Sequence, residues 1–308
     1  MASPLDKQVL YVTGKGGVGR STVAGALGIA LARRGRRTIV CEVSGQDRLA
    51  RAYGVDTAGD DETQLDDCLW GISIDPWAAL HAWLGKALGS GRLARLLFDN
   101  NAFQYFTAAA PGAREMASIV KVWELAQRER WKGGAEGYDS VIVDAPASGH
   151  GIGMLRTPRT FANLARVGPI HSQSERVGEL LRDKRRTGYL AVALAEEMPV
   201  NETLELQRAL PGAVGAGLDA VVVNGLYPKR FSAADVERFA GGNDRRPDTA
   251  RALAAARTEH NWARGQQSQL GRLRRGIDAP VVTLPFVFEP ALGIAELEHL
   301  AHELDRKL

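Results

Sequence analysis

The segment TGKGGVGRST, residues 13 to 22, constrains the fold of this chain more than any other stretch. An apolar run typical of a buried strand, QVLYVT (8–13), comes directly before it, and VAGALGIALARRG, which has the composition of a helix, follows it. Closely spaced glycines let successive backbone N–H groups point at one anion, and the helix dipole adds positive potential. The segment predicts a phosphate-binding loop formed by Gly14, Gly16, Gly17, Val18, Gly19, Arg20, Ser21 and Thr22.

The spacing from Gly14 to Ser21 matches the pattern G-x-x-x-x-G-K-[ST], except that Arg20 stands in place of the lysine. Arginine keeps the positive charge, so we expect the attraction to phosphate to persist. Its planar guanidinium is bulkier than an ammonium group, so we expect the geometry and rate of turnover to differ. Ser21 is a candidate Mg²⁺ ligand through its hydroxyl. The alternative, a glycine-rich turn that binds no ligand, is disfavoured by the spacing and the context.

Short apolar runs alternate with longer helical stretches along the chain, which is typical of a mostly parallel sheet with helices on both faces. Several runs are nearly continuous in Val, Ile and Leu, as expected of strands that are buried on both sides. We expect one α/β domain that spans residues 1–308. The clearest runs after the first are 38–43, 140–146, 189–194, 220–226 and 280–286, and a weaker one is 71–75.

A long insertion, residues 76–135, lies between the second and third clear runs. Apolar side chains recur on one helical face near its start and again near its end. We expect a helical subdomain with its own core, and a groove for a hydrophobic protein client is the alternative. The residues that carry the two faces are Trp77, Leu80, Leu84 and Leu88, then Met116, Ile119, Val120 and Trp123.

Composition and charge narrow the function classes. No apolar run approaches the ~20 residues that span a bilayer, and the first residues lack the features of a secretory signal, so we expect a cytoplasmic protein with no integral membrane segment. Cys41 and Cys68 form no CxxC pair, which disfavours a disulfide framework or a zinc site. The net charge of +3 is too small to indicate nucleic-acid binding by itself.

The early lysine of the loop adds a resemblance. KGGVG-x-[ST]-T, which begins at Lys15, resembles the deviant Walker A loop of the SIMIBI-class P-loop ATPases, a group that includes MinD, ParA, the nitrogenase iron protein, ArsA and the GET-pathway ATPase. The resemblance implies a P-loop NTPase fold that binds ATP or ADP with Mg²⁺. It also implies that Lys15 is catalytic and reaches across a dimer interface to the partner's nucleotide.

Two later segments resemble the ArsA/GET branch of that group. YDSVIVDAPASGHGIGMLRTP (138–158) is similar to its switch II region, which implies that Asp144 takes the Walker B role and organises Mg²⁺, with Gly149 near the γ-phosphate. LPFVFEPALGIAELEHL (284–300) is similar to the loop and helix around adenine, and the matching residues are Pro285 and Phe286. Asn224, after another apolar run, matches the asparagine that reads the adenine edge, and an ordinary turn is the alternative for it.

The chain departs from the branch after its second strand. Where those ATPases carry a stretch close to D-x-D-P-A-H-S-L, this chain has Glu42 at the first acidic position, Ser44 at the second and Gly45 in place of the proline. A serine cannot act alone as a general base at neutral pH. Asp47 and Glu42 are the other candidates for orienting the attacking water. This variant resembles a bacterial subgroup, known mainly from actinobacteria, in which two related chains can form a heterodimer.

Together these features predict a dimeric Mg²⁺-ATPase with weak hydrolysis that couples nucleotide state to the helical subdomain. A non-hydrolysing partner of a related chain is the second hypothesis, motivated by Arg20 and Ser44. ParA-like nucleic-acid binding through the basic segments 182–188 and 257–276 is the weakest, because most such runs are solvated helix faces. Arsenite transport is disfavoured, since the two cysteines do not match the thiolates of ArsA.

Overall fold

The computed structural model describes residues 3–43, 47–56, 59–87, 112–131, 134–241, 247–289 and 291–308. Its strands are β1 (Val9–Gly14), β2 (Thr38–Glu42), β3 (Thr63–Asp66), β4 (Leu69–Ser73), β5 (Ser140–Asp144), β6 (Thr187–Leu194), β7 (Ala220–Leu226) and β8 (Val281–Pro285). They form one eight-stranded sheet in the order β3-β4-β2-β5-β1-β6-β7-β8. Neighbouring strands pair in parallel except β3 and β4, which are antiparallel. The prediction of a mostly parallel sheet is confirmed.

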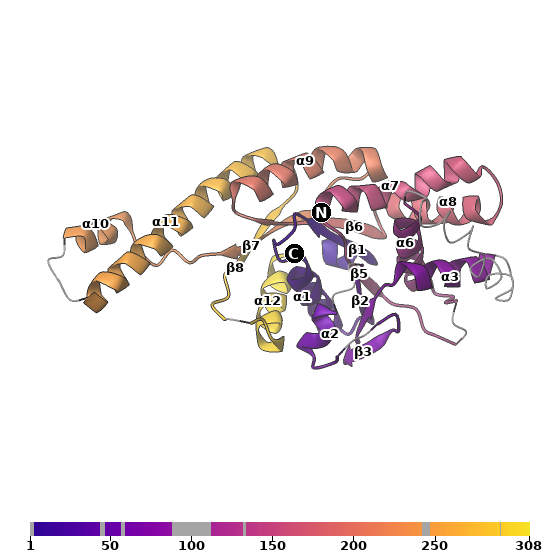
Figure 1. The fold of residues 1–308 in the computed structure, drawn as a ribbon, viewed down its shortest axis with the longest axis horizontal. Helices are drawn as coiled ribbons and strands as arrows, with labels where there is room; N and C mark the ends of the chain where they lie inside the picture. The colour runs from indigo at the N-terminus through magenta and orange to yellow at the C-terminus, as the bar shows by residue number, and fades with distance from the viewer. Residues whose placement is uncertain are drawn as a thin grey trace.

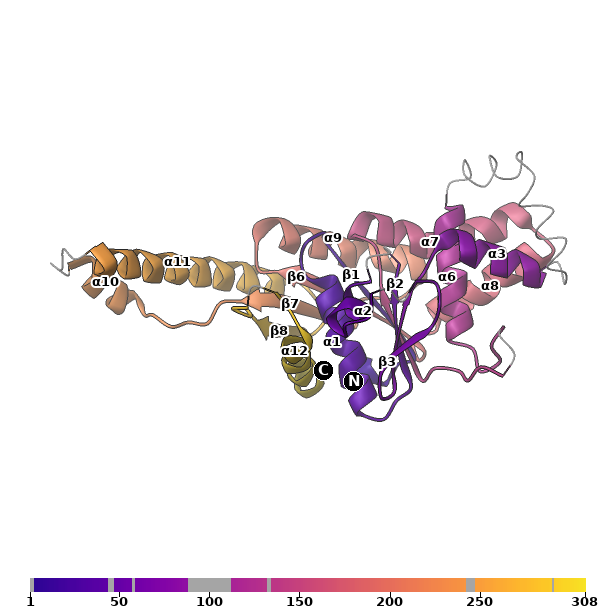
Figure 2. The same ribbon diagram turned by 60° about the horizontal axis from the view of Figure 1, so that its bottom comes forward.

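Helices cover both faces of this sheet (Figures 1 and 2). Apart from a short 3₁₀ turn, η1 (Pro4–Asp6), the described helices are α1 (Arg20–Arg33), α2 (Arg48–Ala52), α3 (Pro76–Ala87), α6 (Ala113–Leu125), α7 (Ser148–Ala165), α8 (Pro169–Arg182), α9 (Glu197–Val214), α10 (Ala233–Gly241), α11 (Pro247–Gly276) and α12 (Ile294–Lys307).

Strand β1 shows why its residues form a central strand. Leu10 and Val12 pack in the core with residues of α1 and α12, whereas Val9 and Tyr11 pack in the core on the opposite face with residues of α6, α7 and α8. All four side chains are at most 2% exposed. Because successive side chains of a strand point to opposite faces, a strand covered on both sides must be apolar throughout.

The described part of the 76–135 insertion packs directly on the sheet. Leu80 and Trp83 of α3 and Met116 and Ile119 of α6 are buried in the same core as β1, β2 and β5. These helices therefore share the core of the sheet instead of enclosing a separate one in the described residues. Leu88 lies outside the described residues, and the boundaries of the insertion stay a prediction.

Helix α11 extends beyond the sheet. Its last turns pack against α9 and β7 through Leu270 and Leu273, which are buried. A helix of 30 residues is about 45 Å long, and its first half projects away from the sheet together with α10 (Figures 1 and 2). We call α10 and α11 the arm. None of the described helices is long and apolar enough to cross a bilayer.

The topology brings the predicted site residues to one edge of the sheet. In the parallel register Asp144 pairs with Val12, near the end of β1, and Asn224 pairs with Leu194 at the end of β6. Carboxyl ends of parallel strands meet at the same edge, and ligands of open α/β sheets bind there. The phosphate loop, which follows β1, lies at this edge.

Candidate functional site

The loop after β1 needs glycine at two positions where the backbone approaches other groups closely. Gly14 has φ +150°, and a Cβ atom there would lie 2.2 Å from the carbonyl oxygen of Val192. Gly19 has φ +89°, and a Cβ atom there would lie 2.2 Å from Nδ2 of Asn224. Any side chain at either position would clash and would strain the backbone. The loop then leads into α1, which begins at Arg20.

A short hydrogen bond joins the start of α1 to the end of β5. The hydroxyl of Ser21 donates to Oδ2 of Asp144 at 2.5 Å. Asp144 is 2% exposed, and its Oδ1 is buried and accepts no hydrogen bond from the described residues. Burial raises the pKa of Asp144, while Ser21 and the charge of Arg20 act in the opposite direction. An unsatisfied carboxylate oxygen beside a hydroxyl is a set of hard oxygen donors that fits Mg²⁺.

Arg20 is turned back on its own loop. One of its terminal nitrogens, Nη1, donates to the carbonyl oxygen of Gly14 at 3.0 Å. The guanidinium thus holds the two ends of the loop together. Any contact between Arg20 and a phosphate has to be made with its remaining N–H groups or after this bond breaks.

Lys15 forms an ion pair within the chain. Its Nζ lies 2.7 Å from Oε1 of Glu202 on α9. The other oxygen of Glu202 accepts a hydrogen bond from Ser148 at 3.0 Å, and Ser148 is the first residue of α7. Gly149 and His150 follow it as exposed residues in the first turn. The loop is therefore connected through Glu202 to the segment that resembles switch II.

Glu42 has a structural role at the end of β2. It is 6% exposed, and its two carboxylate oxygens accept hydrogen bonds from the backbone N–H groups of Arg48 (3.1 Å) and Leu49 (2.9 Å). The carboxylate caps the first turn of α2, whose N-terminal N–H groups have no partners within the helix. Asp47 is the residue before this helix. Ser44 and Gly45 lie outside the described residues.

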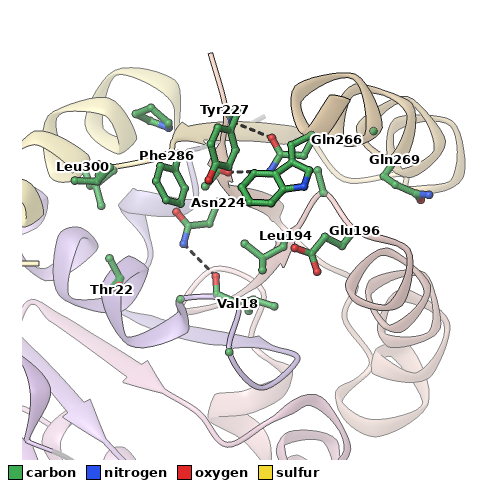
Figure 3. A pocket seen from close by; sticks show the side chains of 18 of the residues that line it. Val18, Thr22, Leu194, Glu196, Asn224, Tyr227, Gln266, Gln269, Phe286 and Leu300 are labelled. Atoms are coloured by element: carbon green, nitrogen blue, oxygen red, sulfur yellow. Dashed lines mark hydrogen bonds between the residues drawn. The ribbon is translucent and has the colours of Figure 1, made fainter. Parts of the chain in front are cut away.

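A cavity of about 710 Å³ lies beside the loop. Figure 3 shows how side chains from the loop, β7 and α11 and from the end of β8 surround it. Nδ2 of Asn224 donates to the carbonyl oxygen of Val18 at 3.0 Å, so the amide oxygen is directed away from the loop toward Phe286 (Figure 3). The lining includes the predicted residues Gly17, Val18, Gly19, Thr22, Asn224, Pro285 and Phe286, and also Leu194, Tyr227, Trp262 and Gln266, which the sequence did not indicate.

The predicted residues thus form two groups, one on each side of the phosphate loop. Ser21 and Asp144 form the oxygen pair, with Lys15 and Arg20 bonded to neighbouring groups, while the remaining predicted residues border the cavity, apart from Gly14 and Gly16. Glu202 was missed because nothing in its local sequence distinguishes it from other surface glutamates. Of the two cysteines, Cys41 is buried and burial raises the pKa of its thiol, so it stays protonated.

An α/β sheet with this loop after β1 and a buried aspartate at the end of β5 defines a P-loop NTPase. A family model described as anion-transporting ATPase matches residues 7–170, which is just over half of the chain. The chain belongs to this family, the ArsA ATPases, and the resemblance to ArsA and the GET ATPases is confirmed.

Named relatives agree with this assignment. ATPase BagA of Mycobacterium tuberculosis is 33% identical over 236 residues, covering 75% of this chain and 68% of BagA. ATPase GET3 of Kluyveromyces lactis is 26% identical over 262 residues, which is 73% of this chain and 74% of GET3. A putative arsenical pump-driving ATPase of Chlorobaculum tepidum is 20% identical over 341 residues, 96% of this chain and 75% of the relative.

Proposed function

We propose that this chain is a Mg²⁺-dependent, ATP-binding ATPase that hydrolyses slowly and acts as a homodimer or as a heterodimer with a related chain. One observation carries the proposal: a single glycine loop borders both an oxygen pair suited to Mg²⁺, Ser21 and Asp144, and a cavity large enough for a nucleobase. A loop between those two features suits the phosphate chain of a nucleotide.

The residues divide the work by their chemistry. Ser21 and Asp144 would hold Mg²⁺, which when bound neutralises phosphate charge. Lys15 would stabilise developing charge on the transferred phosphoryl group. Asn224 is oriented to accept a hydrogen bond with its amide oxygen, because its Nδ2 is engaged by Val18. An acceptor at this place suits the amino group of adenine better than the carbonyl of guanine, so we propose a preference for ATP over GTP.

Three features support slow turnover. Arg20 is bonded to Gly14, which limits its freedom to follow the leaving phosphate. Both oxygens of Glu42 accept hydrogen bonds from the backbone of α2, so this carboxylate is held at the helix instead of being free to turn toward a water. Ser44 stands where the related ATPases carry an aspartate.

The same features favour a second candidate, a non-hydrolysing partner that uses the nucleotide to set a dimer interface. In either case we propose that nucleotide state is coupled to the helices of the 76–135 insertion, since α6 contacts α7, which begins at the Ser148–Glu202 hydrogen bond. We also propose a hydrophobic protein client and a cytoplasmic location, by analogy with the GET branch.

Two substitutions separate the candidates. Phosphate release is measured under MgATP for the wild type, Arg20→Lys and Ser44→Asp, alone and with a related partner chain, and ATP affinity is measured by calorimetry. A slow ATPase shows release above buffer in the wild type and faster release in Ser44→Asp. Activity that appears only in Ser44→Asp would establish the non-hydrolysing candidate, and absence of any heat with ATP or GTP would reject both.

A further inference from the structure

One wall of the cavity comes from the arm. Asn224 and Phe286 belong to the sheet edge, whereas Trp262, Gly265 and Gln266 belong to α11. Trp262 lies near the middle of α11, ahead of the buried Leu270 that packs on α9. A cavity with one wall on a projecting helix can change shape when that helix moves.

Gln266 fastens this turn of α11 to the end of β7. Its Oε1 accepts a hydrogen bond from the backbone N–H of Tyr227 at 2.8 Å, and its Nε2 donates to the carbonyl oxygen of Gly225 at 3.0 Å (Figure 3). Both ends of the amide are therefore used in holding the arm. The neighbouring Gly265 has no heavy atom within 4 Å of its Cβ position, so the cavity is open beside it.

Trp262 precedes Gln266 by four residues and so lies on the same face of α11. Its ring meets Tyr227 edge-on, with centroids 5.5 Å apart and an interplanar angle of 66°. Tyr227 in turn stacks on Phe286 at 4.5 Å and 19°. Yet Trp262 is 57% exposed and Phe286 is 37% exposed. Large exposed aromatic rings that border one cavity are typical of a ligand site.

We propose that the arm completes the nucleobase site: Trp262 packs against the base of the bound nucleotide, and Gln266 positions Trp262 by fixing α11 to β7. This inference rests on the proposed nucleotide binding. Aromatic rings hold every base through its π-face, so Trp262 supplies affinity, while Asn224 supplies the choice of base. Occupancy of the base site then holds the arm against the sheet.

The test compares a ligand that has a base with one that lacks it. Calorimetry of the full chain measures MgATP and magnesium tripolyphosphate for the wild type, Trp262→Ala and Trp262→Phe. Trp262→Ala should weaken MgATP about tenfold, the scale of one stacking contact, and leave tripolyphosphate unchanged. Trp262→Phe should restore most of the affinity because it keeps an aromatic face.

Phe288→Ala is the matched control. Phe288 is a 51% exposed ring that meets Phe286 edge-on at 4.9 Å but is not among the residues that line the cavity. Its truncation should change the affinity for MgATP by less than about threefold. The role of Trp262 would be overturned by any of three results. These are an equal loss of MgATP affinity in Phe288→Ala and Trp262→Ala, an equal loss of affinity for MgATP and tripolyphosphate in Trp262→Ala, and no loss of affinity in Trp262→Ala. A wild type that binds neither ligand would instead reject nucleotide binding itself.

Hydrogen exchange tests the positioning role of Gln266. MgATP should slow the exchange of backbone amides in residues 258–270, and tripolyphosphate should not. Gln266→Leu keeps Trp262 but removes both hydrogen bonds to the end of β7, so it should lose this ATP-specific protection. It should also bind MgATP several-fold more weakly, while its affinity for tripolyphosphate should not change. Equal protection by the two ligands in the wild type would overturn the link between the base and the arm.

Discussion

Nζ of Lys15 lies 2.7 Å from Oε1 of Glu202, so the early lysine of the phosphate loop is bound to α9 of its own chain. Ser148 donates to the other oxygen of the same carboxylate. The hydrogen bond from Lys15 lowers the pKa of Glu202, which keeps this group ionised at neutral pH. A dimer in which Lys15 contacts the partner's nucleotide can form only after this ion pair breaks.

We therefore expect Glu202→Gln to strengthen nucleotide-dependent dimerisation. Both side chains of the pair are 30% exposed, so the interaction is worth at most about 1 kcal/mol in each protomer. A symmetric dimer breaks two such pairs, so its dissociation constant should fall by no more than about thirtyfold. Sedimentation velocity with and without MgATP measures it. Glu205→Gln, an exposed carboxylate on the same helix, is the control and should have no effect. A weaker dimer for Glu202→Gln alone would mean that the pair supports dimerisation instead of opposing it.

Asp144→Asn should stabilise the nucleotide-free protein. Burial raises the pKa of Asp144 in the folded state above its unfolded value, so ionisation of this carboxyl disfavours folding at neutral pH. The difference in unfolding free energy between Asp144→Asn and the wild type should grow as pH rises through the folded pKa of Asp144. It should vanish well below the unfolded pKa of this group. Thermal unfolding at several pH values measures it. MgATP should raise the Tm of the wild type more than ATP with a chelator does. This difference between the two conditions should be absent in Asp144→Asn.

Ser21→Ala should have the opposite sign in the same unfolding experiment. It removes the hydroxyl that donates to Oδ2 of Asp144 and leaves a buried carboxylate with less compensation, which should cost about 1–3 kcal/mol. Stabilisation by Ser21→Ala would contradict the role of this hydroxyl in compensating the buried charge, and destabilisation by Asp144→Asn would contradict the unfavourable burial of that charge.

Gly19→Ala tests the geometry of the loop. At this position φ is +89° and the new Cβ would meet Nδ2 of Asn224 at 2.2 Å, so the strained loop should cost about 1–3 kcal/mol of stability and lower nucleotide affinity. Gly16→Ala is the control: its φ is ordinary and no heavy atom lies within 4 Å of its Cβ position. Urea unfolding and calorimetry should separate the two variants, and equal effects would refute the role of the close approach to Asn224.

Seven of the eight strands and the phosphate loop could be predicted from the sequence, because strands covered on both faces must be apolar and the loop needs glycine at fixed spacing. Strand β3 was not predicted, since its residues TQLD alternate between exposed and partly buried positions at the sheet edge and carry no apolar run. Edge strands depend on a neighbour's backbone more than on their own side chains.

The missed parts of the site depend on contacts between distant segments. Glu202 lies 187 positions after Lys15 in the chain (202 minus 15). It can pair with Lys15 only because α9 packs beside the loop in the folded protein. The sequence places Trp262 in a basic helical segment, whereas its position at the cavity depends on the Gln266 bonds to the end of β7. Local motifs identify groups that contact the phosphates, whereas partners of those groups come from tertiary packing.

A buried ionic cluster fastens α6 to the edge of the sheet. Arg130 contacts Glu124 of α6 at 2.7 Å and Glu62, which precedes β3, at 2.5 Å. The side chains of Arg130 and Glu124 are 1% and 2% exposed. Burial alone would raise the pKa of both carboxyl groups, but hydrogen bonds from Arg130 and the charge of Lys121 hold the pKa of each below its ordinary value.

Arg130→Met should therefore destabilise the protein by about 1–3 kcal/mol, because it leaves Glu124 charged in the core with only Lys121 and the backbone N–H of Trp131 as partners among the described residues. Adding Glu124→Gln should recover most of that loss, since the amide oxygen can still accept from the backbone N–H of Trp131. Carboxylates with lowered folded pKa values stabilise the protein above their unfolded pKa of about 4.3, and this contribution disappears as pH falls through the folded values. Urea unfolding at pH 7 and below pH 4 measures this contribution. The wild type should lose more unfolding free energy between the two pH values than the double variant. If Arg130→Met were as stable as the wild type at pH 7, the electrostatic role of the cluster would be disproved.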